Sequence, residues 1–208
     1  MRKNFGAKCW LYPMPVLIVG TYDENGAPNA MNAAWGGIYD TNLVMVCLAD
    51  EHKTTENIRK NGAFTLSFAT ESTVAPCDYV GIVSANDEPN KFEKAGFHAE
   101  KSELVNAPII KELPMTVECR LAKFTEDGIC IGEIVNISAD ECVLDENGKI
   151  DANASIGPYA RIRPGTEIQE NVKMCQLQLE KRRTESEEQF SGNYANQQAE
   201  YAQDFRMN

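Results

Sequence analysis

The strongest constraint on the fold is a series of short apolar segments joined by turn sequences. Residues 15–22 (PVLIVGTY) end at the tetrapeptide DENG, which is typical of a tight β-hairpin turn. Further strand-like segments follow at residues 28–40, 42–49, 63–70, 115–124, 129–140 and 142–145. Closely spaced strands with hairpin signals predict a mainly-β fold, an antiparallel barrel or sandwich, instead of a doubly wound parallel sheet.

Short helices are predicted between these strands. Residues 53–62 (KTTENIRKNG) have a helical pattern, with Thr54 or Thr55 as the N-cap and Gly62 as the terminating residue. Residues 76–84 and 89–97 have the pattern of two more short helical pieces. From about residue 151 the chain becomes polar, which places a domain at 1–154 and an extension at 155–208.

The extension is rich in Gln, Glu, Asn and Arg. Residues 172–189 have the pattern of an amphipathic helix, and we expect the last stretch to be a mobile tail. Two interpretations stand: a solvated extension, or an arm that packs on a partner subunit.

Charge and hydropathy exclude several function classes. The formal net charge of −11 disfavours binding to nucleic acid or to anionic membranes. No apolar run approaches the roughly 20 residues of a membrane-spanning helix, and the N-terminal residues lack a secretory signal pattern. The seven cysteines are odd in number and form no C-x-x-C pair, and several of them, such as Cys47 and Cys130, lie in apolar strand-like segments. We expect these to be buried, reduced thiols, and we expect no metal site and a cytoplasmic location.

Residues 29–37 (NAMNAAWGG) form a strand-like segment of mostly small side chains. Side chains alternate along a strand, so the segment has two faces: Asn29, Met31, Ala33 and Trp35 on one, and Ala30, Asn32, Ala34 and Gly36 on the other. The accessible backbone and the Asn amides suit a flat heteroaromatic ligand with polar edges. A close crossing over another strand would also require small residues.

Basic and hydroxyl side chains stand at the predicted start of the helix over 53–62. A helix N-terminus presents free N–H groups and a partial positive charge. His52, Lys53, Thr54 and Thr55 therefore make a candidate phosphate-binding site. Ordinary helix capping with an exposed lysine is the alternative. Lys91, in a polar loop, is a third candidate group, and simple solvation is its alternative.

The order and spacing of five motifs, at residues 12–37, 52–58, 77–97, 113–121 and 131–151, resemble the flavin reductase-like, FMN-binding split-barrel family, which includes flavoredoxin. The resemblance covers residues 14–151. It implies a small antiparallel barrel that forms a homodimer, with FMN bound non-covalently near the subunit interface. It also implies that the isoalloxazine ring lies against Asn29 and Trp35, that the phosphate lies at residues 52–55, and that Lys91 helps to hold the cofactor.

Three functions follow from this resemblance. The first is an NAD(P)H-dependent oxidoreductase or flavin reductase in which FMN carries the chemistry, so that no catalytic side chain is required. The second is an electron carrier that accepts electrons from a redox protein, and the third is a flavin-binding module without turnover. The sequence has no G-x-G-x-x-G motif for a Rossmann nicotinamide site, but a nicotinamide can also stack directly on a flavin.

Overall fold

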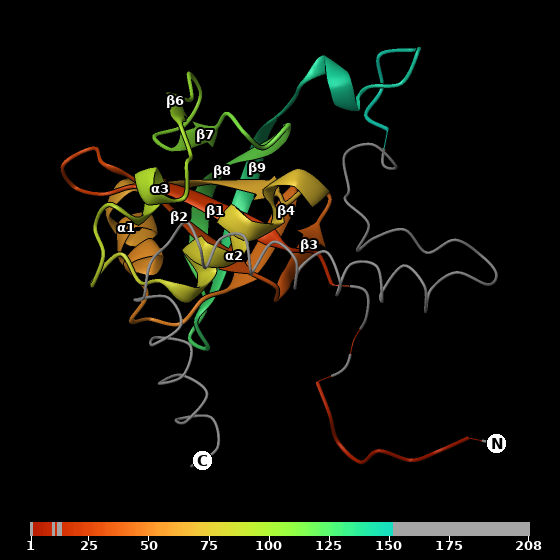
Figure 1. Ribbon diagram of the computed structural model, residues 1–208. Coiled ribbons are helices and arrows are strands. Elements are labelled where there is room, and N and C mark those ends of the chain that lie inside the picture. The colour runs from red at the N-terminus through yellow and green to blue at the C-terminus, as the bar shows by residue number, and fades with distance from the viewer. Residues whose placement is uncertain (1, 10, 12–13, 152–208) are drawn as a thin grey trace, which may run out of the picture. The chain divides into compact units, whose positions relative to one another are not determined.

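The computed structural model describes residues 2–9, 11 and 14–151 (Figure 1). The predictions for the extension at 155–208, including the helix over 172–189, lie outside the described residues. The elements, in chain order, are β1 (Leu17–Tyr22), β2 (Pro28–Ala33), β3 (Gly36–Asp40), β4 (Leu43–Cys47), α1 (Lys53–Asn61), β5 (Ala63–Phe68), a 3-10 turn (Glu71–Thr73), α2 (Val74–Ile82), α3 (Lys91–Lys94), β6 (Ala99–Lys101), β7 (Pro108–Ile110), β8 (Met115–Phe124), β9 (Ile129–Ala139) and a second 3-10 turn (Glu141–Val143).

Seven strands form one antiparallel sheet in the order β2-β1-β5-β8-β9-β4-β3, and β6 pairs with β7 separately. The predicted hairpin at DENG joins β1 to β2. Its turn is closed by the Asp23 carboxylate, which accepts hydrogen bonds from the backbone N–H groups of Asn25 and Ala27, each at 2.8 Å. Gly26 supplies the positive φ of 81° that the turn requires.

The connection between β2 and β3 forces this sheet to curl. The two strands occupy opposite edges of the sheet, yet they are separated in the chain by Ala34 and Trp35 alone. Three Cα–Cα steps span at most about 11 Å, so the two edges must approach each other. The backbone N–H of Cys47 donates to the Trp35 carbonyl at 2.8 Å and fixes the connection against β4. The result is a split antiparallel barrel with few helices, which confirms the predicted fold class.

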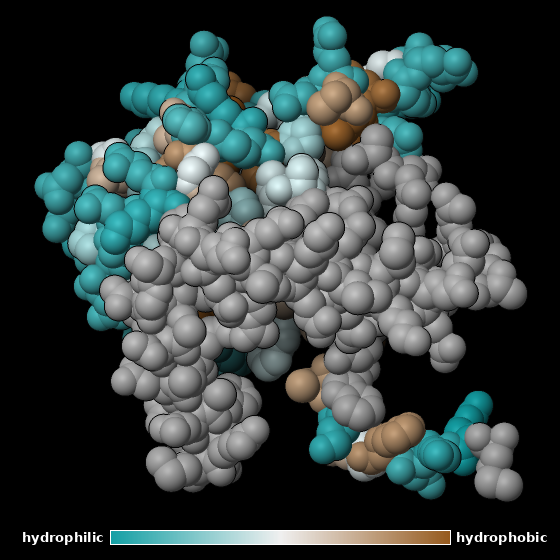
Figure 2. Space-filling model, in the orientation of Figure 1, coloured by the Kyte–Doolittle hydropathy of each residue, from teal (hydrophilic) through white to brown (hydrophobic). Residues whose placement is uncertain are grey.

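The curled sheet is buried on both faces, with alternate residues of β1 in different cores. The inner core joins strands to α1 and includes Leu17, Val19, Val46, Ile58, Phe64 and Cys119. On the outer face, α2 and α3 cover β1 and β2, through Ile18, Ala30, Val80 and Phe92. In Figure 2 the visible surface on the side of α1 and α3 is mostly hydrophilic. Within the described residues, no helix is long and apolar enough to cross a membrane.

Several predicted elements need correction. The strand expected over 28–40 is interrupted at Ala34 and Trp35, because the chain changes sheet edge there. The first half of the strand expected over 142–145 belongs to a 3-10 turn. The turn that follows it is present and is closed by a bridge between Leu144 and Ile150. The helix predicted over 76–84 begins two residues earlier, and the piece predicted over 89–97 contains a four-residue helix.

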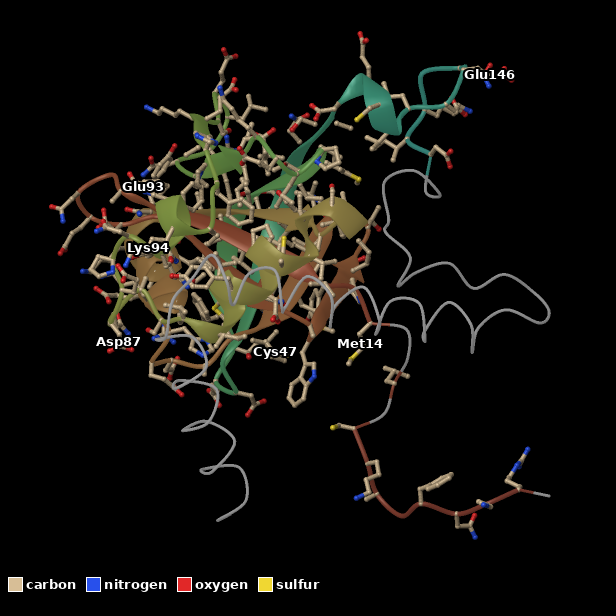
Figure 3. All side chains as sticks on the ribbon, in the orientation of Figure 1. Met14, Cys47, Asp87, Glu93, Lys94 and Glu146 are labelled. Carbon is tan, nitrogen blue, oxygen red and sulfur yellow. The ribbon has the colours of Figure 1, made fainter. Side chains whose placement is uncertain are left out.

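The cysteine prediction is partly wrong. Cys77, Cys119 and Cys130 are buried, and burial raises the pKa of each thiol to about 12. Cys47 is exposed (Figure 3), because the alternation along β4 turns Val44 and Val46 into the core and Cys47 away from it. The apolar sequence around Cys47 therefore does not predict whether its side chain is buried.

Candidate functional site

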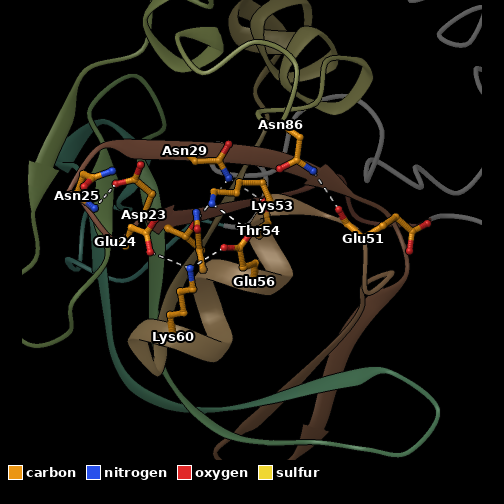
Figure 4. Close-up of polar contacts among 12 residues, drawn as sticks. Asp23, Glu24, Asn25, Asn29, Glu51, Lys53, Thr54, Glu56, Lys60 and Asn86 are labelled. Atoms are coloured by element: carbon orange, nitrogen blue, oxygen red, sulfur yellow. Dashed lines mark hydrogen bonds and ion pairs between the residues drawn. The ribbon is translucent and has the colours of Figure 1, made fainter.

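A buried polar network joins the small-residue strand to the start of α1 (Figure 4). The Asn29 amide nitrogen on β2 donates to Thr54 Oγ1 at 2.9 Å and to Thr21 Oγ1 at 3.4 Å. The Asn57 amide nitrogen, one turn further along α1, donates to Thr21 Oγ1 at 3.1 Å. Two segments that the sequence analysis assigned to one site, residues 29–37 and 52–55, therefore lie together.

Three buried polar atoms in this region have no hydrogen-bond partner among the described residues: the amide oxygens Asn29 Oδ1 and Asn57 Oδ1, and the ring nitrogen His52 Nδ1. Asn29 is only 5% exposed and Asn57 is fully buried. Leaving a buried polar atom unpaired costs about 1–3 kcal/mol, so such a group is a sign of a binding site for donors. Thr21 and Asn57 were not predicted from the sequence as members of this network, although the i, i+3 spacing of Thr54 and Asn57 places these two on one helical face.

The N-terminus of α1 is not capped in the way that was predicted. His52 is the N-cap residue, and no side-chain hydrogen bond caps the helix. Thr54 and Thr55 lie inside the first turn and are buried, because this face of the helix packs on the barrel. Thr55 Oγ1 donates to the Ala49 carbonyl at 2.7 Å, and Thr54 Oγ1 accepts from Asn29. The groups left for an anion are therefore the first-turn backbone N–H groups and Lys53.

Lys53 is itself part of a chain of ion pairs. Its Nζ lies 3.1 Å from Glu56 Oε2, and Glu56 Oε1 lies 2.7 Å from Lys60 Nζ. Lys60 Nζ also pairs with Glu24 Oε2 at 2.9 Å. Hydrogen bonds from Lys60 and Lys53 hold the pKa of the Glu56 carboxyl below its usual range, so Glu56 is a carboxylate at neutral pH. The first turn of α1 thus carries one positive and one negative side chain.

Close packing explains part of the small-residue segment without a ligand. Ala30 is fully buried in the outer core and Ala33 is 7% exposed in the inner core. A Cβ at Gly36 would lie 2.7 Å from Leu17 Cδ1 and 2.8 Å from the Met45 carbonyl oxygen. Close packing between strands, which the sequence analysis gave as the alternative to a ligand, therefore explains the small residues at Ala30, Ala33 and Gly36.

Other residues of the segment remain accessible. Met31 and Ala34 are half-buried, and Trp35 is 59% exposed at the connection between the two sheet edges. Asn32 lies on the opposite face from Asn29, where its amide nitrogen donates to the Cys77 carbonyl of α2 at 3.4 Å. Gly81 allows this approach, since a Cβ there would lie 2.6 Å from Asn32 Cβ. Asn29 and Asn32 therefore make their hydrogen bonds on opposite faces of β2.

Lys91 is buried instead of solvated, and its ammonium donates to backbone carbonyls instead of contacting Asn29 or Thr54. It is 3% exposed, and its Nζ donates to the carbonyls of Val80 and Val83 at 2.9 and 2.8 Å. These carbonyls belong to the C-terminal end of α2, where a cation is favourable. Burial lowers the pKa of the Lys91 ammonium to about 8. Lys91 therefore anchors α2, and its contribution to cofactor binding stays a prediction.

The fold and the polar network together define a split-barrel protein in which an uncapped helix N-terminus lies beside a small-residue strand. Residues 9–156 match the model of the flavin reductase like domain, and the chain belongs to that family. It is similar to the flavoredoxin of Desulfovibrio vulgaris (Miyazaki F), at 38% identity over 74% of this chain and 84% of that chain, with a TM-score of 0.71. It is also similar to the flavoredoxin of Methanosarcina acetivorans, at 26% identity over 81% of this chain and 98% of that chain, with a TM-score of 0.67.

Among curated proteins, the chain matches an uncharacterized protein of Aeropyrum pernix at 29% identity over 120 residues. The match covers 57% of this chain and 45% of that protein, so the chain spans less than half the length of this relative.

Proposed function

We propose that the protein binds FMN and acts as a flavin-dependent oxidoreductase. The observation that carries the proposal is the junction of Asn29 with the uncapped first turn of α1, in a chain that belongs to the flavin reductase-like family. In this proposal the phosphate lies at the first turn of α1, beside Lys53. The flavin ring lies against the accessible residues Met31, Ala34 and Trp35.

The residues present fit FMN chemically. Phosphate is an acceptor and suits the backbone N–H groups of the first turn and the Lys53 ammonium. The ring imide and the ribityl hydroxyls can donate to the unpartnered amide oxygen Asn29 Oδ1, and a hydroxyl, which can donate or accept, suits His52 Nδ1 in either tautomer. One ligand with donors along its length and an anion at its end would therefore satisfy both kinds of group.

Bound FMN would supply hydride and electron transfer, and the protein would supply position and shielding. The proposed electron donor is NADH or NADPH. An electron carrier that accepts electrons from a redox protein is the second candidate, and it is favoured by the similarity to two flavoredoxins. A cytoplasmic location belongs to the proposal as well, and the free thiols of the described cysteines support it.

The proposal includes a homodimer with the cofactor near the subunit interface. Trp35, Ile38 and Tyr39 are 59%, 71% and 51% exposed, and they lie on or beside the edge strand β3. Large apolar side chains gathered on an edge strand suit contact with a second subunit. Light scattering that gives only a monomer, with FMN still bound, would contradict this part of the proposal.

Titration of FMN into the purified protein, followed by flavin fluorescence, tests binding. Anaerobic addition of NADH or NADPH then separates the two candidates. Bleaching of the flavin absorbance supports the oxidoreductase. Bound FMN that bleaches with dithionite but not with either nicotinamide, and is reoxidised by a redox protein, supports the carrier. A protein that quenches no FMN fluorescence would show that the proposal is wrong.

A further inference from the structure

The first turn of α1 contains the negative charge that competes for Lys53. The Glu56 carboxylate contacts Lys53 at 3.1 Å and Lys60 at 2.7 Å. The hydroxyls of Thr54 and Thr55 contact Asn29 and the Ala49 carbonyl, so Lys53 is the charged donor that this turn offers to an anion. In the absence of an anion, the charge of Lys53 is compensated within its own turn.

We infer that Glu56 is an internal counter-ion of the phosphate site, which makes FMN binding weaker than it would be without the Glu56 charge and leaves the binding of flavins without a phosphate unaffected. This inference rests on the proposed function. A phosphate monoester carries about −1.5 to −2 charges at neutral pH, and it must share Lys53 with the Glu56 carboxylate. The like charges repel each other across the lysine, so FMN is held less tightly than the basic sequence around Lys53 suggests.

The opposite effect, in which Glu56 strengthens binding by orienting Lys53, is the smaller one. The side chains of Lys53 and Glu56 are 22% and 43% exposed. A partly exposed i, i+3 pair restrains a lysine only weakly and is worth little to the fold. At low ionic strength, the repulsion between the phosphate and the Glu56 carboxylate at short range is larger than the gain from orienting Lys53. Removing the Glu56 charge should therefore strengthen FMN binding.

The test compares Glu56→Gln with the matched control Glu24→Gln. Both changes remove one negative charge from the same ion-pair chain, but Glu24 contacts Lys60 instead of Lys53. At low ionic strength, Glu56→Gln should lower the Kd for FMN about fivefold and leave the Kd for riboflavin unchanged. Glu24→Gln should change either Kd by less than about twofold. The Glu56 and Glu24 side chains are 43% and 60% exposed and lie outside the core, so both variants should fold, and thermal unfolding checks this.

A salt series gives an independent readout that a purely structural role would not change. The FMN affinity of Glu56→Gln should fall more steeply with salt than that of the wild type, because its site carries an uncompensated charge. Unchanged or weaker FMN binding by Glu56→Gln, with FMN bound by the wild type, overturns this inference alone. A wild-type protein that binds no FMN overturns the proposed function and this inference with it.

Discussion

Replacement of Lys91 by methionine should change how stability depends on pH. Methionine is unbranched and of similar length, so the core around α2 and α3 keeps its volume while the ammonium is removed. In the folded protein, burial lowers the pKa of Lys91 from 10.5 to about 8. Between these values the unfolded chain binds the proton and the folded chain does not, so the free energy of unfolding that Lys91 contributes rises with pH.

The size of this effect follows from the shift in pKa. At 1.36 kcal/mol per pKa unit, the stability of the wild type relative to Lys91→Met should rise by about 3 kcal/mol between pH 8 and pH 10.5. Below pH 8 the difference should be constant. Urea unfolding of both proteins from pH 7 to pH 10 measures it, and taking the difference removes every other group that titrates there. A difference that stays level across this range would refute the claim that Lys91 is desolvated.

Three other predictions concern packing, thiols and the ring. Gly132→Ala should destabilise the fold by about 1–3 kcal/mol in urea unfolding, because its Cβ would overlap the Phe64 ring, whereas Gly37→Ala, which meets nothing within 4 Å, should be nearly neutral; equal losses would contradict this. Burial raises the pKa of Cys119 to about 12, so wild-type stability should fall above about pH 9 as the unfolded thiol ionises, and Cys119→Ala should remove about 1.4 kcal/mol per pH unit of that loss; an unchanged slope would contradict it. Trp35→Ala should weaken FMN and riboflavin equally in fluorescence titrations, and a loss confined to FMN would place Trp35 at the phosphate.

Features with local causes could be predicted from the sequence. The β1–β2 hairpin was predicted because Asp23 and Gly26 build the turn by themselves. The end of α1 was predicted because Gly62 adopts the left-handed conformation, with a φ of 66°, that terminates helices. The proximity of residues 29–37 to the start of α1 came from family resemblance, and the Asn29–Thr54 hydrogen bond now gives it a physical basis.

Features that depend on the closed sheet could not be predicted. The strand-like sequence pattern continues through Ala34 and Trp35. The strand itself is interrupted at these residues because the two edges of the sheet meet there. The burial of Lys91 depends on the carbonyls at the end of α2, and no local pattern marks a lysine that will meet them. Likewise, Thr54 was expected to face a ligand, but α1 turns it toward Asn29 and the barrel.

In the proposed function, the phosphate group of FMN binds at the first turn of α1. The most direct test measures the Kd for FMN and for riboflavin, in the wild type and in Lys53→Gln, with Thr54 left intact because it belongs to the buried network. A charge-assisted hydrogen bond is worth about 1.5–3 kcal/mol, so FMN should bind the wild type about tenfold more tightly than riboflavin or better. Lys53→Gln should remove most of that advantage and leave riboflavin unchanged. Equal affinities for the two flavins in the wild type, or equal losses in Lys53→Gln, would show that the phosphate does not bind beside Lys53.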